Sequence, residues 1–246
     1  MLNHRRPRQT TWSYTDDRQG FIIEAMEDIK RGEQVYDSYG KKCNYRFFLN
    51  YGFINLNNDA NEFPFKVYYE EDDKYIQLKK EMIGDDADFK KFRILASYDE
   101  RIVHEFLSWM RFVLYDEKIT LLYEYKGMAI TAAQKYKQRH ADSDSDDEED
   151  YSKGFKAKDL PPLSINNEKK VLQKIYDMSV EAMNKYPTSY EEDQEILKRT
   201  DLTFNQSNSV LYRAGEKEIL QFFITTTSKF MQLFDMKWKD ARKTAQ

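Results

Sequence analysis

Cysteine is almost absent from the sequence, and histidine is scarce. One cysteine, Cys43, and three histidines occur among 246 residues. A lone cysteine cannot form a disulfide within the chain, which suits a reducing compartment, and we expect the cytosol or the nucleus. His104 and His140 have no partner at ligand spacing and Cys43 has no second cysteine nearby, so we expect no metal site.

Long hydrophobic runs are also missing. No stretch approaches the roughly 18 to 20 apolar residues that a membrane helix requires, and the start has no apolar signal-peptide core. We therefore expect neither export nor a membrane partner. The formal net charge of −4 argues against a dedicated nucleic-acid-binding protein, which usually carries a basic field over its whole domain.

What the sequence does contain is apolar material for one large core or two small ones, with 40% hydrophobic residues. From Trp12 to about Phe65 the pattern is that of short strands and turns. FIIEAM at 21–26 and QVYDSY at 34–39 are typical of strands, and Arg31-Gly32-Glu33 separates them. One further strand is predicted at 66–70.

Helical periodicity follows. Apolar residues at three- and four-residue spacing over 102–114 predict one helix. A second helix is expected from Ile119 to roughly Gln138, and a third over 171–183, ending before Pro187. With the preceding strands, these helices predict an α+β fold.

Two more helices are predicted toward the carboxy terminus. Thr188 and Glu191 have the spacing of a capping box for a short helix. A long final helix is expected from about Gln206 to Trp238. This half of the chain is thus predicted to be a helical bundle.

The charges are unevenly distributed. DSDSDDEED at 142–150 is an acidic block without apolar residues, so we expect a disordered insertion at about 140–155. Arg5, Arg6 and Arg8 give the chain a basic start. These arginines fit either a solvated terminus or a contact with an acidic protein substrate or nucleic acid.

A set of short motifs lies in the first 53 residues: Asn3-His4, GEQVYDSYG at 32–40, Asn44 and YGF at 51–53. Together they resemble the carboxy-terminal half of a SET methyltransferase domain. The class resembled includes Rubisco large-subunit lysine methyltransferase and actin-histidine methyltransferase, in which SET precedes a helical substrate-binding domain. SYEED at 189, LKRTDL at 197 and RAGEKEIL at 213 resemble the end of that helical domain.

The resemblance implies a domain division and a longer protein. Residues 1–65 correspond to the carboxy-terminal half of SET, and 66–246 to the helical Rubisco-LSMT-type substrate-binding domain. The amino-terminal half of SET, with its Gly-rich cofactor loop, has no counterpart in this sequence. Met1 is therefore expected to be an internal methionine of a longer chain.

The resemblance also implies the roles of individual residues toward the cofactor S-adenosylmethionine. Tyr39 corresponds to the catalytic tyrosine, whose hydroxyl lies beside the transferred methyl group. Asn3 would bind the amino-acid end of the cofactor through its side chain, and His4 the adenine through its backbone. Phe53 would form an aromatic wall near the adenine, and Asn44 would brace the turn after Gly40.

Each of these assignments has a plainer alternative. Tyr39 could be an ordinary core tyrosine, Phe53 could serve packing alone, and Asn3-His4 could be an exposed terminal pair. Gly32, Gly40 and Gly52 are expected to serve turns or close backbone approach rather than ligand contact.

The motifs lead to two hypotheses of function. The first is an S-adenosylmethionine-dependent protein N-methyltransferase, with lysine as the default acceptor, histidine as the alternative, and the helical domain binding the protein substrate. The second is a non-catalytic protein-interaction module, made of a truncated SET remnant and the helical domain.

Overall fold

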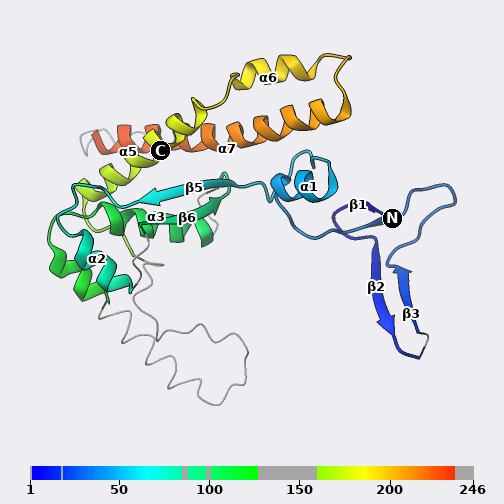
Figure 1. Ribbon diagram of the computed structural model, residues 1–246, viewed down its shortest axis with the longest axis horizontal. Coiled ribbons are helices and arrows are strands. Elements are labelled where there is room, and N and C mark those ends of the chain that lie inside the picture. Colours follow the sequence, from blue (N-terminus) through cyan, green and yellow to red (C-terminus); the bar gives the residue numbers. More distant parts are fainter. Residues whose placement is uncertain (1, 18, 85–87, 98–100, 127–159, 236–246) are drawn as a thin grey trace, which may run out of the picture. The chain divides into compact units, whose positions relative to one another are not determined.

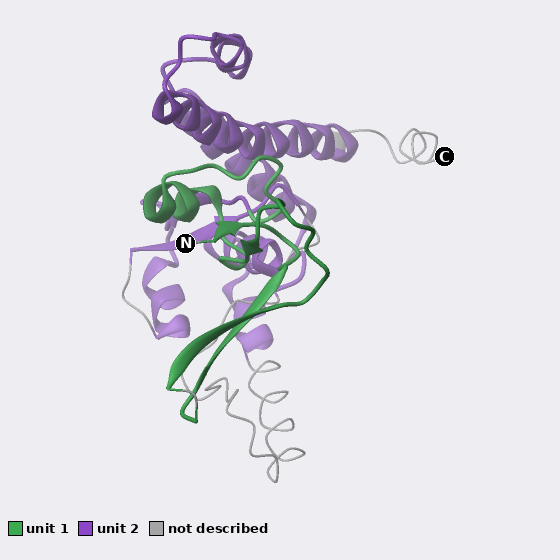
Figure 2. Cartoon of the chain, turned by 90° about the vertical axis from the view of Figure 1, so that its right-hand side faces the viewer, with its two compact units in different colours: residues 1–60 green, residues 61–246 purple. Residues whose placement is uncertain are grey.

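The computed structural model describes residues 2–17, 19–84, 88–97, 101–126 and 160–235. The chain divides into two compact units, Met1–Ala60 and Asn61–Gln246, which Figure 2 shows in different colours. The described part combines helices with short strands, as the predicted α+β class requires. The acidic block and the predicted insertion at about 140–155 lie outside the described residues.

The first unit is built from four strands and one helix among its described residues. Their bounds are β1 Asn3–His4, β2 Thr10–Thr15, β3 Gly20–Ala25, β4 Tyr36–Asp37 and α1 Asn44–Tyr51. Strands β2 and β3 form an antiparallel hairpin (Figure 1). Strand β1 pairs with β4 in parallel. The strand predicted at 21–26 is confirmed, whereas the run at 34–39 contributes only the two residues of β4.

Helix α1 was not predicted, because its sequence NYRFFLNY is rich in aromatic residues, which favour strands. The helix ends at Gly52, which has φ 74° and donates its backbone N–H to the Phe48 carbonyl across 3.0 Å. Only glycine adopts this left-handed conformation at little cost, and it is the usual residue at a helix carboxy terminus. The glycine of the YGF motif therefore ends the helix and turns the chain toward Phe53.

The second unit holds the remaining described elements. Their bounds are β5 Phe63–Tyr68, α2 Ile76–Ile83, β6 Phe89–Ile94, α3 Arg101–Leu114, α5 Ile165–Met183, α6 Tyr190–Leu197 and α7 Phe204–Asp235. Helix α7 packs along both α5 and α6, and β5 pairs antiparallel with β6 (Figure 1). Phe65, Phe106, Ile175 and Phe223 are among the core residues of this unit, all nearly inaccessible to solvent.

The helical predictions are largely confirmed. Helix α3 matches the predicted span 102–114 closely, and α5 begins six residues earlier than Val171, where Ser164 accepts the N–H of Asn167. Residues 119–126 are helical, and the rest of the helix predicted to Gln138 lies outside the described part. Helix α7 begins at Phe204, and its predicted end at Trp238 is also outside that part.

Three details of the second unit differ from the predictions. The capping box consists of Ser189 and Glu192, not Thr188 and Glu191, because the hydroxyl of Ser189 accepts the N–H of Glu192. The strand expected at 66–70 runs from Phe63 to Tyr68. Helix α2 and strand β6 were not predicted, since each is short and rich in lysine. Among the described helices none is both long and apolar enough to cross a membrane.

Candidate functional site

The pairing of β1 with β4 brings the Asn-His pair and the YDSYG segment together in the first unit. Asn3 lies opposite Tyr36 and His4 opposite Asp37, and the N–H of Arg5 donates to the carbonyl of Asp37 across 2.9 Å. These segments are more than thirty residues apart in the sequence. A parallel pair needs a long connection between its strands, and here the β2–β3 hairpin lies within that connection.

Tyr39 is held to the same segment by two hydrogen bonds. Its backbone N–H donates to Nδ1 of His4 across 3.0 Å, and its hydroxyl donates to the carbonyl oxygen of Leu2 across 2.6 Å. The rings of His4 and Tyr39 stack with their centroids 5.2 Å apart. The hydroxyl proton of Tyr39 is thus used within the protein, and the lone pairs of its oxygen remain as acceptors.

The environment of His4 favours its neutral form and selects one tautomer. Burial lowers the pKa of His4, and the positive charges of Arg6 and Lys42 lower it further, against the opposing effect of Asp37. Because Nδ1 accepts a hydrogen bond, the proton of the neutral ring is on Nε2. Nε2 is buried and has no hydrogen-bond partner in the described part of the chain. His4 therefore presents one buried donor that the fold itself does not use.

An aromatic cluster surrounds this histidine. The ring of Phe53 lies 6.2 Å from His4 and 6.3 Å from Tyr39, centroid to centroid. Two further rings from α1 complete the cluster: Phe47 is 4.8 Å from His4, and Tyr51 stacks on Tyr39 at 4.5 Å. His4, Tyr39 and Phe53, proposed as site residues from sequence, thus converge on one place.

Phe47 and Tyr51 were missed by the sequence analysis, although a signal for them exists. They are four residues apart, so they lie on one face of α1. That face is recognisable only when the segment is taken as a helix rather than as a strand. Phe47 is completely buried, while Tyr51 is partly exposed and forms the rim of the cluster.

Asn3 and Asn44 occupy different environments. Asn3 is exposed at the first position of β1. Asn44 is buried at the start of α1, where Oδ1 accepts the N–H of Asn55 across 3.2 Å and the side-chain amide of Asn58 across 3.0 Å. Asn44 thus braces the segment after α1, and the amide of Asn58 links it to the residues after Gly40 by donating also to the carbonyl of Lys42 across 2.9 Å.

The three arginines of the basic start make ion pairs within the first unit. Arg5 pairs with Glu27, Arg6 with Asp59, and Arg8 lies 3.9 Å from Asp37. Their charges are therefore partly neutralised by the unit itself. In the described part of the chain, no group of three or more His, Cys, Asp or Glu side chains is placed to hold a metal ion.

The β2–β3 hairpin exposes an apolar face. Trp12 lies opposite Ile23 and Tyr14 opposite Phe21, and alternate residues of a strand share a face. Each of these four side chains is at least 50% exposed. Contiguous apolar surface of this kind is unusual on a self-contained domain.

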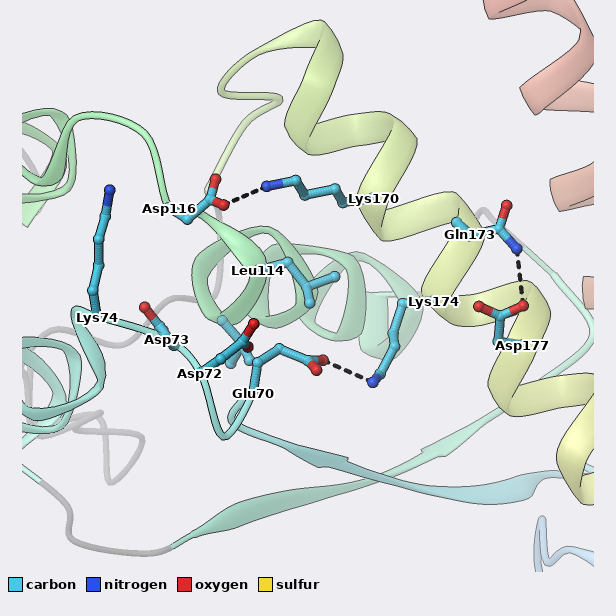
Figure 3. Close-up of a pocket in the computed structure, with 11 residues that line it drawn as sticks. Glu70, Asp72, Asp73, Lys74, Leu114, Asp116, Lys170, Gln173, Lys174 and Asp177 are labelled. Carbon is cyan, nitrogen blue, oxygen red and sulfur yellow. Dashed lines mark hydrogen bonds and ion pairs between the residues drawn. The ribbon is translucent and has the colours of Figure 1, made fainter.

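The second unit contains a charged pocket of about 440 Å³ between the segment 70–74, the end of α3 and one side of α5. Figure 3 shows ion pairs on its walls: Lys174 with Glu70 at 2.7 Å and Lys170 with Asp116 at 2.6 Å. Behind the wall, Nζ of the fully buried Lys79 donates to Asp73 and to the carbonyl of Val113. Burial lowers the pKa of Lys79, and its bond to Asp73 opposes that effect.

A second depression, of about 630 Å³, lies between β5 and α5. Aromatic side chains line it, including Phe63, Tyr68 and Tyr186, and four lysines stand among them. It shares Glu70 and Lys174 with the charged pocket. We call this depression the β5–α5 groove.

Comparison with known proteins gives a consistent result for the second unit. A family model described as Rubisco LSMT substrate-binding matches residues 70–220. The actin-histidine N-methyltransferases of Papio anubis and Homo sapiens are each 26% identical to this chain over 225 residues, covering 90% of it and 34% of the relative. The chain thus spans about a third of the length of the curated relatives that it matches.

Solved structures share the fold over nearly the whole chain. Rubisco LSMT bound to AdoMet superposes with a TM-score of 0.66 at 19% identity, covering 98% of this chain and 51% of that one. The SET domain of LSMT bound to MeLysine and AdoHcy gives a TM-score of 0.66 at 20% identity, with the same coverage. The likeness confirms the predicted fold class, a carboxy-terminal SET part followed by a helical domain.

Proposed function

Because the chain belongs to the Rubisco LSMT substrate-binding family, we propose that it is the carboxy-terminal part of an S-adenosylmethionine-dependent protein N-methyltransferase. In this proposal residues 1–65 complete a SET catalytic domain and 66–246 bind the protein substrate. Lysine is the default acceptor and histidine the alternative. The relatives named as actin-histidine N-methyltransferases and the Rubisco LSMT structures crystallised with AdoMet or AdoHcy support it.

The observation that carries the proposal is the convergence of His4, Tyr39 and Phe53. Three residues from separate motifs meet in one aromatic cluster, and a hydrogen bond joins two of them, His4 and Tyr39. Packing alone would explain the aromatic rings. It would not explain the buried Nε2–H of His4, which has no hydrogen-bond partner among the described residues. An unused donor of this kind is typical of a site that receives a polar ligand.

The residues present fit the cofactor. Adenine is a flat heteroaromatic ring, and Phe53 offers an aromatic wall for it. His4, the expected backbone contact of the adenine, lies beside that wall, with the two ring centroids 6.2 Å apart. Exposed Asn3 carries an amide that donates and accepts at once, which suits a zwitterionic amino-acid group. When bound, S-adenosylmethionine supplies an electrophilic methyl group on a sulfonium.

Tyr39 has a defined electrostatic part in this proposal. Because its hydroxyl proton is donated to Leu2, its oxygen faces a ligand only as an acceptor. Such an oxygen orients an N–H of the acceptor nitrogen and attracts polarised methyl C–H groups. Positioning of this kind supplies much of the acceleration in an in-line transfer.

The experiment that tests the proposal is methyl transfer by the native protein isolated from its source. The protein is incubated with S-adenosyl-[methyl-³H]methionine and an extract of proteins from that source, and the labelled amino acid is identified after hydrolysis. We expect labelled methyl-lysine, or methyl-histidine for the alternative acceptor. The Tyr39→Phe protein should transfer at least about 100-fold more slowly, since positioning errors commonly have that cost, and Tyr51→Phe should retain most activity.

The alternative function is a non-catalytic protein-interaction module. The exposed apolar face of the β2–β3 hairpin favours it for the polypeptide taken alone, because it leaves the first unit with surface that a complete domain would cover. Cofactor binding separates the two. A native protein that binds no S-adenosylmethionine by equilibrium dialysis, yet binds partner proteins, would establish the interaction module. For either function we propose a location in the cytoplasm or nucleus.

A further inference from the structure

Two lysines face each other across the β5–β6 ribbon of the second unit. Lys66 of β5 lies directly opposite Lys91 of β6, and both side chains are exposed. Directly opposed residues of an antiparallel pair have Cβ atoms about 4.5 to 5.5 Å apart, and like charges in that arrangement destabilise the sheet. The pair therefore destabilises the protein when no ligand is bound. An anion bound between the two ammonium groups would relieve this repulsion.

The other charges of the β5–α5 groove do not neutralise this pair. Four lysines and two glutamates line the groove. Both glutamates are engaged by the other two lysines, Lys174 with Glu70 at 2.7 Å and Lys185 with Glu181 at 2.8 Å. Across the described residues, no ion pair within 4.0 Å involves Lys66 or Lys91. The lining of the groove thus carries two positive charges in excess.

Aromatic rings adjoin the lysine pair on the same face of the ribbon. Tyr68 lies opposite Phe89, their ring centroids are 5.1 Å apart, and both are well exposed. Nζ of Lys66 lies over the Phe89 ring, 5.2 Å from its centroid. This cation–π contact holds the Lys66 ammonium in place rather than leaving it free in solvent. The face therefore presents ordered cations beside flat apolar surface.

The groove next to this face has the dimensions of a peptide site. Its volume is about 630 Å³, and Met178, Ala182 and Tyr186 of the α5 side complete its lining. Strand β5 has six residues, so it spans roughly 20 Å along the groove at about 3.3 Å per residue. A segment of similar length in extended conformation matches that span.

We propose that the β5–β6 face and the β5–α5 groove dock an extended acidic protein segment. A carboxylate of the segment lies between Lys66 and Lys91, and an apolar or aromatic side chain enters the groove beside Tyr68. That this segment is part of the methylated protein rests on the proposed function. Nucleic acid is a poorer match, because the groove is lined largely by apolar and aromatic side chains with an excess of only two positive charges, whereas a nucleic-acid site usually has a broad basic field.

Fluorescence anisotropy with synthetic probes tests the proposal on the full chain without any cofactor. The probe is a fluorescein-labelled ten-residue peptide of alternating Glu and Tyr, and peptides of alternating Gln and Tyr or Lys and Tyr are the reference ligands. We expect the Glu peptide to bind best, and its affinity to fall as salt rises. The double variant K66Q/K91Q should bind it about tenfold more weakly, as expected for the loss of two exposed ion pairs.

A matched control removes equal charge elsewhere on the second unit. K198Q/R199Q neutralises two exposed cations at the end of α6, and its affinity for the Glu peptide should stay within about twofold of the unchanged protein. Folding is monitored by thermal denaturation. Because K66Q/K91Q relieves a like-charge pair, its Tm should equal or exceed that of the unchanged protein, so weaker binding cannot come from unfolding.

Several results would overturn the proposal. One is equal binding of the three peptides, and another is a loss in K66Q/K91Q no larger than in K198Q/R199Q. Tighter binding of a labelled oligonucleotide than of the Glu peptide would assign the face to nucleic acid instead. Self-association that disappears in K66Q/K91Q by sedimentation would assign it to a second copy of the chain. Since no methyl transfer is measured, a negative binding result would not contradict the proposed methyltransferase activity. Likewise, a protein that transfers no methyl group could still bind the Glu peptide.

Discussion

Nδ1 of His4 accepts the backbone N–H of Tyr39 across 3.0 Å, which ties the segment before β2 to the segment after β4. The bond requires the neutral imidazole with its proton on Nε2. Protonation of Nδ1 would therefore break it and place a third positive charge beside those of Arg6 and Lys42.

The first prediction concerns pH. Burial and the neighbouring cations lower the pKa of His4 in the folded protein below the ordinary value of about 6.5. In the window between those two values the unfolded chain binds more protons, so stability falls as pH falls. The contribution of neutral His4 to the stability of the folded protein is complete above about pH 6.5. We expect the Tm of the unchanged protein to decrease from pH 7 toward pH 5.5.

The control for this effect is His4→Gln, which keeps an acceptor and does not titrate. Its Tm should change less over the same pH range, as measured by differential scanning fluorimetry in buffers of matched ionic strength. His104→Gln, a change in helix α3 of the other unit, should preserve the full pH dependence. Parallel curves for His4→Gln and the unchanged protein would exclude His4 as the group responsible.

The second prediction concerns the buried amide of Asn44. Asn44→Ala removes the acceptor of the Asn55 N–H and of the Asn58 side chain, so these donors lose a partner. We expect a loss of about 1 to 3 kcal/mol in the free energy of unfolding of the first unit. Asn50→Ala, at an exposed position of the same helix, should be neutral or slightly stabilising, since alanine is the better helix former. Urea denaturation measures both, and similar values for the two would contradict the bracing role.

The third prediction concerns the fully buried ion pair between Asp193 of α6 and Lys217 of α7, 2.5 Å apart, which Arg213 extends. Asp193→Asn leaves the Lys217 charge buried without a counterion, and we expect a loss of about 3 to 5 kcal/mol. Glu195→Gln, which removes an exposed ion pair from the same helix, should stay within about 0.5 kcal/mol. Equal effects of the two changes in urea denaturation would refute this role.

Asp193 also predicts acid sensitivity of the second unit. Burial by itself raises the pKa of this carboxyl, but its hydrogen bonds from Arg213 and Lys217 outweigh burial, and the net pKa is lowered. Its contribution is thus present above the ordinary value of about 3.9 and is lost as pH falls through the lower folded value. The stability difference between Asp193→Asn and the unchanged protein should therefore shrink in acid below pH 4.

The fourth prediction concerns the exposed apolar face of the β2–β3 hairpin. We expect the isolated chain to bind the dye ANS and to aggregate, because Trp12, Tyr14, Phe21 and Ile23 stand side by side in solvent. Phe21→Thr with Ile23→Thr should reduce dye fluorescence and light scattering, since threonine retains a high strand propensity. Leu49→Thr, a change of an exposed leucine on α1 outside the hairpin, should leave both nearly unchanged. A monodisperse unchanged chain without dye binding would contradict this prediction.

Hydrophobic periodicity predicted the helices of the second unit well and the elements of the first unit less well. Helix α3 was predicted almost to the residue, because its apolar stripe spans a whole fourteen-residue helix. Helix α1 was missed, because its eight residues are too few for a clear period and its rings favour a strand. The capping box was displaced by one residue, since Thr188 and Ser189 are adjacent hydroxyls and only geometry distinguishes them. The hydroxyl of Thr188 instead donates to Asp193.

The sequence by itself determined the α+β class and the motif residues His4, Tyr39 and Phe53, because these depend on local periodicity and on short patterns. Only the tertiary structure decided what joins them. The β1–β4 pairing places Tyr39 against His4, and α1 adds Phe47 and Tyr51 to the cluster. The opposition of Lys66 and Lys91 was equally invisible in the sequence, since strand register depends on which side chains the core buries, and a shift of one residue reverses every face.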